Sequence, residues 1–264
     1  MNILFIGDIV GSAGRNAVKQ LLPQLKNKWN PTFIIANGEN AAAGRGITSK
    51  IVNELYDQGV HGITMGNHTW DNKEIFDFID EGDRMVRPAN FPAGTPGRGW
   101  TVLKSGNKEL VVINIQGRTF LPAIDCPFQK MDQLLDEIPS KHKHIFVDFH
   151  AEATSEKIAM GWYLDGRVSA VVGTHTHVQT HDEAILPKGT AYVTDVGMVG
   201  SKEGVLGMER DAVIQKFKTA LPVRFNVHEG KWHFHAVLIE LNEQTGRSER
   251  IRLLRHYENE IFME

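Results

Sequence analysis

Short apolar segments of this chain end repeatedly in side chains that bind metal ions. NILFIG is followed by an aspartate, FIIANG by a glutamate and an asparagine, GITMG by an asparagine and a histidine, and two later segments end in histidines. The side chains concerned are Asp8, Glu39, Asn40, Asn67, His68, His150, His175 and His177. Carboxylate, amide and imidazole groups without a thiolate favour divalent manganese, iron, zinc or nickel. The single cysteine, Cys126, excludes both a cysteine-based zinc cage and an intrachain disulfide.

The number of candidate ligands favours two metal ions over one. Seven of these side chains, all but His68, are taken as plausible ligands, and seven exceed what a single tetrahedral site uses. A carboxylate that bridges two ions about 3.5–4 Å apart is a common arrangement in enzymes that cleave phosphoesters. Two divalent ions together carry roughly four positive charges. The carboxylates of Asp8 and Glu39 balance two of these charges. A phosphodiester and a hydroxide would balance the rest, so the charges predict a site that holds an anionic substrate.

Alternating strands and helices must position these side chains. Apolar runs predict strands over 2–7, 33–38, 62–66, 109–117, 144–150, 169–175 and 190–197. Helical spacing predicts helices over 12–29, 48–59, 71–79, 128–138 and 152–163, with Thr48 and Asp71 as N-caps. Strand–helix units of about 30 residues predict right-handed crossovers and a mainly parallel sheet. Because ligands bind at the carboxyl ends of parallel strands, we expect the candidate ligands to converge there.

The C-terminal part changes to alternating strands. VRFNVHEG and KWHFHAVLIELNEQTG predict a hairpin with its turn at Glu229-Gly230. His233 and His235 alternate with large apolar residues, which predicts an exposed face for both histidines. The sequence has no repeat, low-complexity segment or linker. We therefore predict one domain over 1–264, an α/β sandwich with an antiparallel C-terminal addition.

The composition is that of an ordinary globular protein. Hydrophobic residues make up 41% and charged residues 23%, with a net charge of −3. These values exclude general disorder, and no apolar run reaches the roughly 18 residues of a membrane helix. MNILFIGD lacks the basic region of a signal peptide, so we expect a cytoplasmic protein without a membrane partner. The slightly acidic balance does not indicate bulk binding of nucleic acid.

Two glycine-containing segments allow other interpretations. GDIVGSAG resembles a dinucleotide-binding turn, but its spacing is loose and Asp8 would repel a pyrophosphate. We interpret its glycines as letting the backbone approach a metal-bound substrate. In the second segment, Gly44-Arg45-Gly46, the arginine either contacts a phosphate or lies in solvent.

The motifs and their order resemble those of the calcineurin-like metallophosphoesterases. That superfamily carries D-x-H, G-D-x-x-D, G-N-H-[ED], a lone histidine and G-H-x-H, and this chain has Asp8, then GNH at 66–68, then GTHTH at 173–177. It departs at Val10, Glu39 and Thr69, where the superfamily has a histidine, a bridging aspartate and an acid. With these departures it resembles the YmdB-like phosphodiesterases, through GDIVGSAGR, NGENAAAGRG, TMGNHTWD, RPANFP, DFHAEATSEK and VVGTHTHVQT.

The resemblance implies a role for each candidate ligand. Glu39 would bridge two ions, iron or manganese, with zinc and nickel as alternatives. The remaining ligands would form two sets, Asp8 with Asn40 and His177, and Asn67 with His150 and His175. His68 would be the catalytic residue that protonates the leaving oxygen. No substrate-binding residue is identified.

The resemblance also implies a fold and an activity. The fold would be a β-sandwich flanked by helices in αββα layers, in a chain that forms homo-oligomers. The activity would be hydrolysis of 2′,3′- or 3′,5′-cyclic nucleotides, or of related phosphodiesters, by a metal-bridging hydroxide. RNA ends are a further candidate substrate, although the net charge does not indicate them.

Three other functions stay open or are disfavoured. A phosphomonoesterase would prefer dianionic monoesters, and a nucleotide-sensing regulatory protein would bind its ligand with little turnover. Metal amidohydrolases also use H-x-H, but on the first strand of a barrel, whereas His175 and His177 come late in this chain.

Overall fold

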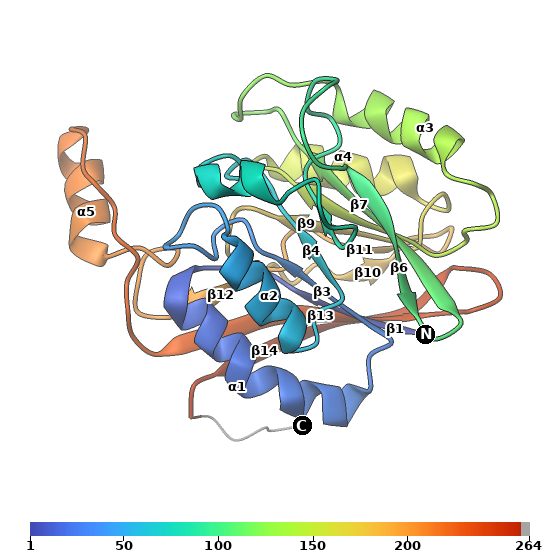
Figure 1. Ribbon diagram of the computed structural model, residues 1–264, viewed down its shortest axis with the longest axis horizontal. Helices are drawn as coiled ribbons and strands as arrows, with labels where there is room; N and C mark the ends of the chain where they lie inside the picture. The colour runs from blue at the N-terminus through green and yellow to red at the C-terminus, as the bar shows by residue number, and fades with distance from the viewer. Residues whose placement is uncertain (260–264) are drawn as a thin grey trace.

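Two β-sheets pack face to face at the centre of the molecule, and helices cover their outer faces (Figure 1). The computed structural model describes residues 1–259. The predicted α/β sandwich with αββα layers is confirmed.

The first sheet contains eight strands, and its N-terminal strands are parallel to one another. In spatial order they are β2 (Asp8–Ile9), β12 (Met198–Ser201), β13 (Trp232–Leu241), β1 (Asn2–Ile6), β3 (Phe33–Asn37), β4 (Gly62–Thr64) and β5 (Met85–Val86), with β14 (Ser248–Tyr257) paired to β13.

The second sheet contains six strands, with a parallel centre from β7 to β11. In spatial order they are β10 (Ala184–Ile185), β11 (Ala191–Val193), β9 (Ala170–Thr174), β8 (Ile145–His150), β7 (Lys108–Gln116) and β6 (Trp100–Ser105).

Helices pack on the outer face of each sheet. The first sheet is covered by α1 (Gly11–Trp29) and α2 (Ser49–Asp57), and the second by α3 (Pro127–Glu137) and α4 (Thr154–Leu164). Thr48 caps α2 as predicted, because its hydroxyl accepts from the Ile51 N–H at 3.3 Å. One further helix, α5 (Arg210–Thr219), projects from the body of the molecule (Figure 1). No helix within residues 1–259 has both the length and the apolar character needed to cross a membrane.

Strand β1 illustrates why the strand segments are apolar throughout. Successive side chains of a strand point to opposite faces, so Leu4 and Ile6 pack toward the helices while Ile3 and Phe5 pack toward the second sheet. Phe5 meets Phe146 of β8 there, with ring centroids 5.0 Å apart. A strand buried on both faces has no polar alternation.

The prediction of which C-terminal segments form a hairpin was wrong. The antiparallel partners are β13 and β14, joined by residues 242–247, and no turn at Glu229-Gly230 joins two strands. His233 and His235 are also not exposed as predicted: their rings stack at 4.4 Å, and His235 is buried. The physical reason is that β13 is a central strand, and Gln179 covers this face by donating to the backbone carbonyls of Val196, Ala236 and Leu254.

Two local predictions also need correction. The helix expected over 71–79 is a short 3₁₀ helix, η1 (Lys73–Asp77), whose cap is Asn72 rather than Asp71. The glycines of GDIVGSAG serve packing: a Cβ at Gly7, after β1, would lie 1.9 Å from the Gly197 carbonyl oxygen, and one at Gly14, in α1, would lie 2.3 Å from that of Val199.

Candidate metal centre

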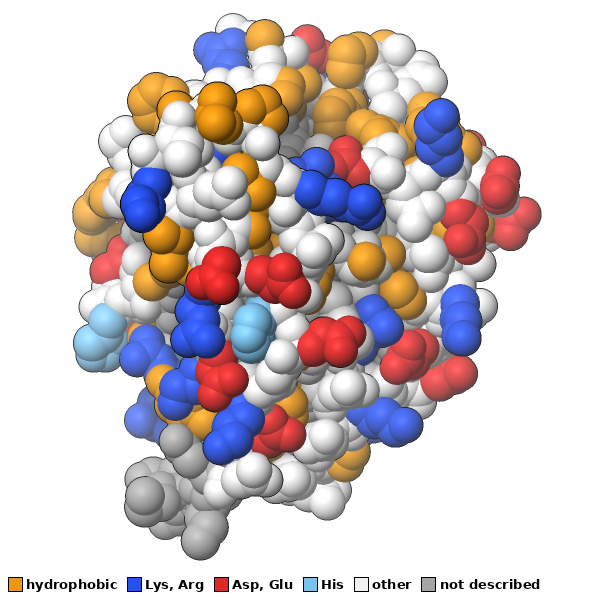
Figure 2. Space-filling model, turned by 90° about the vertical axis from the view of Figure 1, so that its left-hand side faces the viewer, with side chains coloured by type: hydrophobic (Ala, Val, Ile, Leu, Met, Phe, Trp, Pro, Cys, Tyr) orange, Lys and Arg blue, Asp and Glu red, His pale blue; other side chains and the backbone are white. Residues whose placement is uncertain are grey.

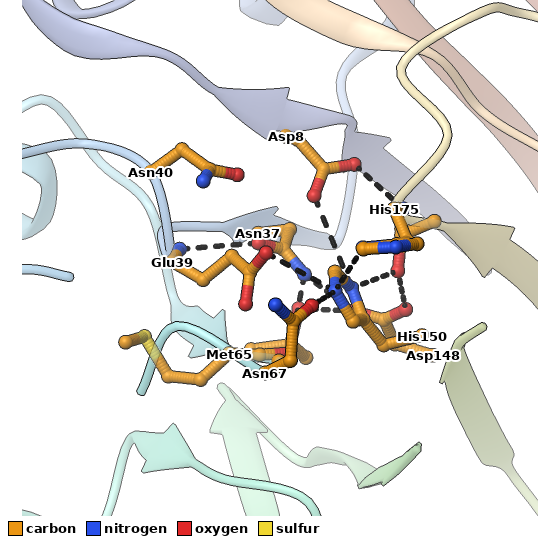
Figure 3. A network of polar contacts seen from close by, with 12 residues as sticks. Asp8, Asn37, Glu39, Asn40, Met65, Asn67, Asp148, His150 and His175 are labelled. Carbon is orange, nitrogen blue, oxygen red and sulfur yellow. Dashed lines mark hydrogen bonds and ion pairs between the residues drawn. The ribbon is translucent and has the colours of Figure 1, made fainter. Parts of the chain in front are cut away.

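The predicted ligands converge at one edge of the two sheets. In the first sheet Asp8 begins β2, and the other ligands lie in the loops after β3 and β4. In the second sheet His150 ends β8, and His175 and His177 lie in the turn after β9. Asp8 and His150 are fully buried, and Glu39 is 1% exposed. Figure 3 shows Asp8, Glu39 and Asn67 around His150. The convergence follows from the parallel strands, whose carboxyl ends meet at this edge.

Three polar atoms of other candidate ligands meet around His150. Its Nε2 lies 2.9 Å from Asn67 Oδ1, 3.1 Å from Glu39 Oε1 and 3.1 Å from His175 Nδ1. Glu39, His150 and His175 form a group whose donor atoms are close enough to hold one metal ion.

A second set of atoms lies beside the first. His177 Nε2 is 3.3 Å from Asn40 Oδ1 and 3.9 Å from Asp8 Oδ1. Asp8 Oδ1 is in turn 3.9 Å from His150 Nδ1, so the two sets are neighbours. The assignment of these residues to two separate ions stays a prediction.

Each histidine of the cluster is oriented through its outer ring nitrogen. His150 Nδ1 lies 2.9 Å from the Thr174 hydroxyl, His175 Nε2 lies 2.9 Å from Glu152 Oε2, and His177 Nδ1 lies 3.3 Å from the Leu206 carbonyl. These oxygens can accept an N–H, which leaves the opposite nitrogen directed at the cluster. Histidine ligands of metal ions are oriented in this way.

The cluster fits divalent cations by its chemistry and its space. In the described part of the chain, Asp8 Oδ1 is a buried oxygen without a hydrogen-bond donor, and the cationic group that faces the buried Glu39 Oε1 is the His150 ring at 3.1 Å. Buried carboxylate oxygens of this kind need a compensating charge or ligand. A Cβ at Gly66 would lie 2.4 Å from both Glu39 Oε2 and His150 Nε2. The absence of a side chain at this position therefore leaves space beside the ligand atoms.

Charges within the cluster set its protonation. Burial raises the pKa of Glu39, but His150 and the His68 N–H outweigh burial and lower this pKa to about 2. Burial lowers the pKa of His150, but the charges of Glu39 and Asp8 raise it to about 9. Burial and His150 lower the pKa of His175 to about 3. At neutral pH Glu39 is thus ionised and His175 neutral, the forms that bind metal, while His150 would release a proton on binding one.

His68 lies beside the cluster rather than within it. Its backbone N–H donates to Glu39 Oε2 at 2.8 Å, and its Nδ1 lies 2.9 Å from Asp71 Oδ2. Since a carboxylate accepts, Nδ1 donates and Nε2 is left free. Sequence reasoning assigned Asp71 to a helix cap and missed this contact, although the three-residue spacing from His68 was a signal.

Two further buried acids were missed as parts of the site. The first, Asp148, joins the two sheets: it accepts from Asn37 Nδ2 at 3.1 Å, from the Thr64 hydroxyl at 2.5 Å and from the Thr174 hydroxyl at 2.7 Å. Because Thr174 also contacts His150, Asp148 fixes that ring. The segment DFH contains this aspartate, but the sequence does not show which strands it contacts.

Asp195 holds the turn that carries His175 and His177. Its Oδ2 accepts from the Thr176 N–H at 3.1 Å, the Thr176 hydroxyl at 2.6 Å and the buried Lys157 ammonium at 2.6 Å. Both histidines have left-handed backbone, with φ of 94° and 65°. This conformation is costly for non-glycine residues and needs support from its surroundings.

The paired sheets and their covering helices form a fold that is also found in solved phosphoesterase structures. The structure of calcineurin-like phosphoesterase YfkN from Bacillus subtilis shares the fold, with a TM-score of 0.57 at 10% identity over 97% of this chain and 90% of that one.

Closer relatives give the family. The model of the YmdB-like protein family matches residues 4–254, and the chain belongs to this family. It is 59% identical to the 2′,3′-cyclic-nucleotide 2′-phosphodiesterase of Bacillus subtilis strain 168 over the full length of both. The structure of a novel phosphatase from Mycoplasma pneumoniae matches with a TM-score of 0.92 at 34% identity, over 97% of this chain and 93% of that one.

Proposed function

We propose that this protein is a metal-dependent phosphodiesterase that hydrolyses 2′,3′-cyclic nucleotides. The observation that carries the proposal is the pair of adjacent ligand sets around Glu39 and His150. The activity named for the Bacillus subtilis relative, at 59% identity, supports the substrate.

The two ligand sets have the composition that two divalent ions require. One ion would be held by Asp8, Asn40 and His177, and the other by Asn67, His150 and His175, with Glu39 between them. When bound, such ions stabilise phosphoryl charge as Lewis acids and lower the pKa of water. Iron and manganese suit this set of oxygen and imidazole donors.

In the proposed reaction, water hydrolyses the cyclic phosphodiester and His68 supplies a proton. A water oxygen bonds to phosphorus and releases a proton, while the P–O2′ bond breaks and O2′ takes a proton from His68. The proton released by the water restores His68, and the product is a 3′-phosphate. His68 is the proton donor in this proposal, because Asp71 holds its Nδ1 and leaves Nε2 free. General acids of this kind contribute about 10²–10⁴-fold to the rate.

A substrate panel tests the proposal. Hydrolysis of 2′,3′-cyclic AMP, 3′,5′-cyclic AMP, bis-p-nitrophenyl phosphate and p-nitrophenyl phosphate is measured at neutral pH with Mn²⁺ and with chelator. We expect metal-dependent cleavage of the diesters and the highest kcat/KM for 2′,3′-cyclic AMP. Preference for the monoester would indicate a phosphomonoesterase, and binding without turnover would indicate a nucleotide sensor.

Replacing His68 with alanine should lower kcat for 2′,3′-cyclic AMP by about 10²-fold or more while leaving the metal content unchanged. The reason is that the ring contacts Asp71 and none of the ligand atoms of the cluster. Steady-state kinetics and elemental analysis of the same sample provide both measurements. Equal loss of turnover and metal would rule out the general-acid role.

A further inference from the structure

A groove beside the metal centre is lined by basic and apolar side chains. It has a volume of about 580 Å³, and its lining residues are Arg45, Lys216, Pro222, Val223, Arg224 and Phe225. All but Arg45 belong to residues 209–228, here called the arm, which contains α5. Figure 2 views the molecule from the side on which α5 projects, and basic and hydrophobic side chains lie next to one another on this face.

The groove is connected to the metal centre through Arg45. Arg45 lies in the same tight loop as Asn40, whose side-chain amide donates to the Gly44 carbonyl at 3.0 Å. Its guanidinium is 3.9 Å from Asp71 Oδ2, the carboxylate that contacts His68. A ligand in the groove would therefore lie next to the proposed proton donor.

The base of the arm is fixed to the metal centre as well. The Leu206 carbonyl, shortly before the arm, contacts His177 Nδ1 at 3.3 Å. The Glu209 N–H donates to the Asn226 carbonyl at 2.9 Å, which ties the two ends of the arm together. The arm thus has a defined position relative to the cluster, although α5 buries only Val213.

The positive charges of the groove are available to a ligand. Within residues 1–259, Lys216 and Arg224 form no ion pair, although Lys216 Nζ donates to the Ala220 carbonyl at 3.4 Å. The only ion pair of Arg45 in this part of the chain is the 3.9 Å contact with Asp71. The Arg45 side chain is 64% exposed. The Phe225 side chain is 38% exposed, so its ring can be reached from the groove.

We infer that this groove binds the nucleotide that precedes a terminal 2′,3′-cyclic phosphate, so that the substrate is the 3′ end of an RNA strand. The inference rests on the proposed function. A cyclic mononucleotide has one phosphate, which the metal centre would occupy. Three further cations and an accessible aromatic ring match a second phosphate and a second base. Single-stranded nucleic acid is bound by this combination of basic groove and stacking ring.

Kinetics with two substrates test this inference. They are 2′,3′-cyclic AMP and the dinucleotide ApA ending in a 2′,3′-cyclic phosphate. For the unmodified protein we expect a kcat/KM at least about tenfold higher for the dinucleotide, with an advantage that shrinks as salt rises. Lys216→Gln combined with Arg224→Gln should remove most of this advantage and leave the mononucleotide rate unchanged. Phe225→Ala should remove part of it.

A matched control removes the same charge elsewhere on α5. Arg210→Gln combined with Lys218→Gln changes two exposed residues outside the groove and should leave both rates unchanged. Equal kcat/KM for the two substrates in the unmodified protein, or equal losses in the control, would overturn the inference. A change of sedimentation coefficient in the groove variant with unaltered kinetics would also overturn it, and would make the arm a contact between copies of the chain.

A binding measurement separates this inference from the proposed function. Fluorescence anisotropy of a 5′-labelled RNA trinucleotide with a 3′-phosphate requires no turnover. We expect weaker binding in the groove variant than in the control, even if neither cyclic substrate is hydrolysed. Equal binding would refute the groove, whereas hydrolysis of the mononucleotide alone would leave the proposed function intact.

Discussion

Replacing Glu39 with glutamine should lower kcat for 2′,3′-cyclic AMP by about 10³-fold. Glutamine has nearly the same size, so the backbone contacts of the loop are kept. The amide lacks the negative charge of the carboxylate. Its NH₂ group would replace either Oε1, which lies 3.1 Å from His150 Nε2, or Oε2, which accepts from the His68 N–H at 2.8 Å. Because both oxygens are used, either orientation of the amide disturbs the cluster.

The Glu39 variant should also bind less metal. Elemental analysis after dialysis, with circular dichroism to check the fold, gives this second measurement. Glu137→Gln is a suitable control because it removes an exposed carboxylate at the end of α3, and it should leave both values unchanged. A Glu39→Gln protein with normal metal content and more than a tenth of the activity would contradict the role proposed for Glu39.

The second large effect is expected at Asp195. Asp195→Asn should weaken the apparent metal affinity by about 10- to 100-fold, because Asp195 orients the turn that carries two of the proposed histidine ligands. Both carboxylate oxygens of Asp195 act as hydrogen-bond acceptors. Oδ2 accepts from the Lys157 ammonium and from the Thr176 N–H and hydroxyl, and Oδ1 accepts from the Gly197 N–H. An amide group cannot accept from all of them. The Mn²⁺ concentration for half-maximal activity measures the change.

Stability and positioning can be separated at Asp195 with a double variant. The single variant leaves the buried Lys157 ammonium unpaired, which costs about 3–5 kcal/mol of unfolding free energy. Lys157→Met combined with Asp195→Asn removes that unpaired charge and should recover much of the stability, as measured by urea unfolding. The metal affinity should stay low, because the contacts with Thr176 are still changed. Recovery of normal affinity together with stability would show that Asp195 is only structural.

The convergence of the site could be predicted because it depends on local features. Apolar runs defined the parallel strands, and each candidate ligand stood where a run ended. Asp8 and His150 lie far apart in sequence and in different sheets, yet they are 3.9 Å apart. The carboxyl ends of the parallel strands carry the candidate ligands, and the face-to-face packing of the two sheets brings these ends together.

The residues that orient the ligands could not be predicted in the same way. Glu152 and Leu206 reach their histidines from segments outside the strands, and Lys157 reaches Asp195 from α4. These contacts depend on how helices and loops pack over the sheet edge, which strand patterns do not encode.

The errors in the C-terminal part have related physical causes. VRFNV has the alternation of a strand but forms only an isolated bridge between Val227 and Met208. The hairpin partner of β13 is therefore β14, which follows it in the sequence. Helix α5 escaped prediction because it buries only Val213 and has no apolar face against the core. The net charge of −3 also hides the basic groove, since it averages over the whole chain.

The most direct test of the account is a metal titration of the chelator-treated protein. Mn²⁺ is added stepwise while release of 3′-AMP from 2′,3′-cyclic AMP and the number of ions bound per chain are measured. The two ligand sets predict no turnover without metal and a rise in activity that levels off at two ions per chain. Full turnover in the metal-free protein, or a plateau at one ion, would contradict the proposed binuclear phosphodiesterase.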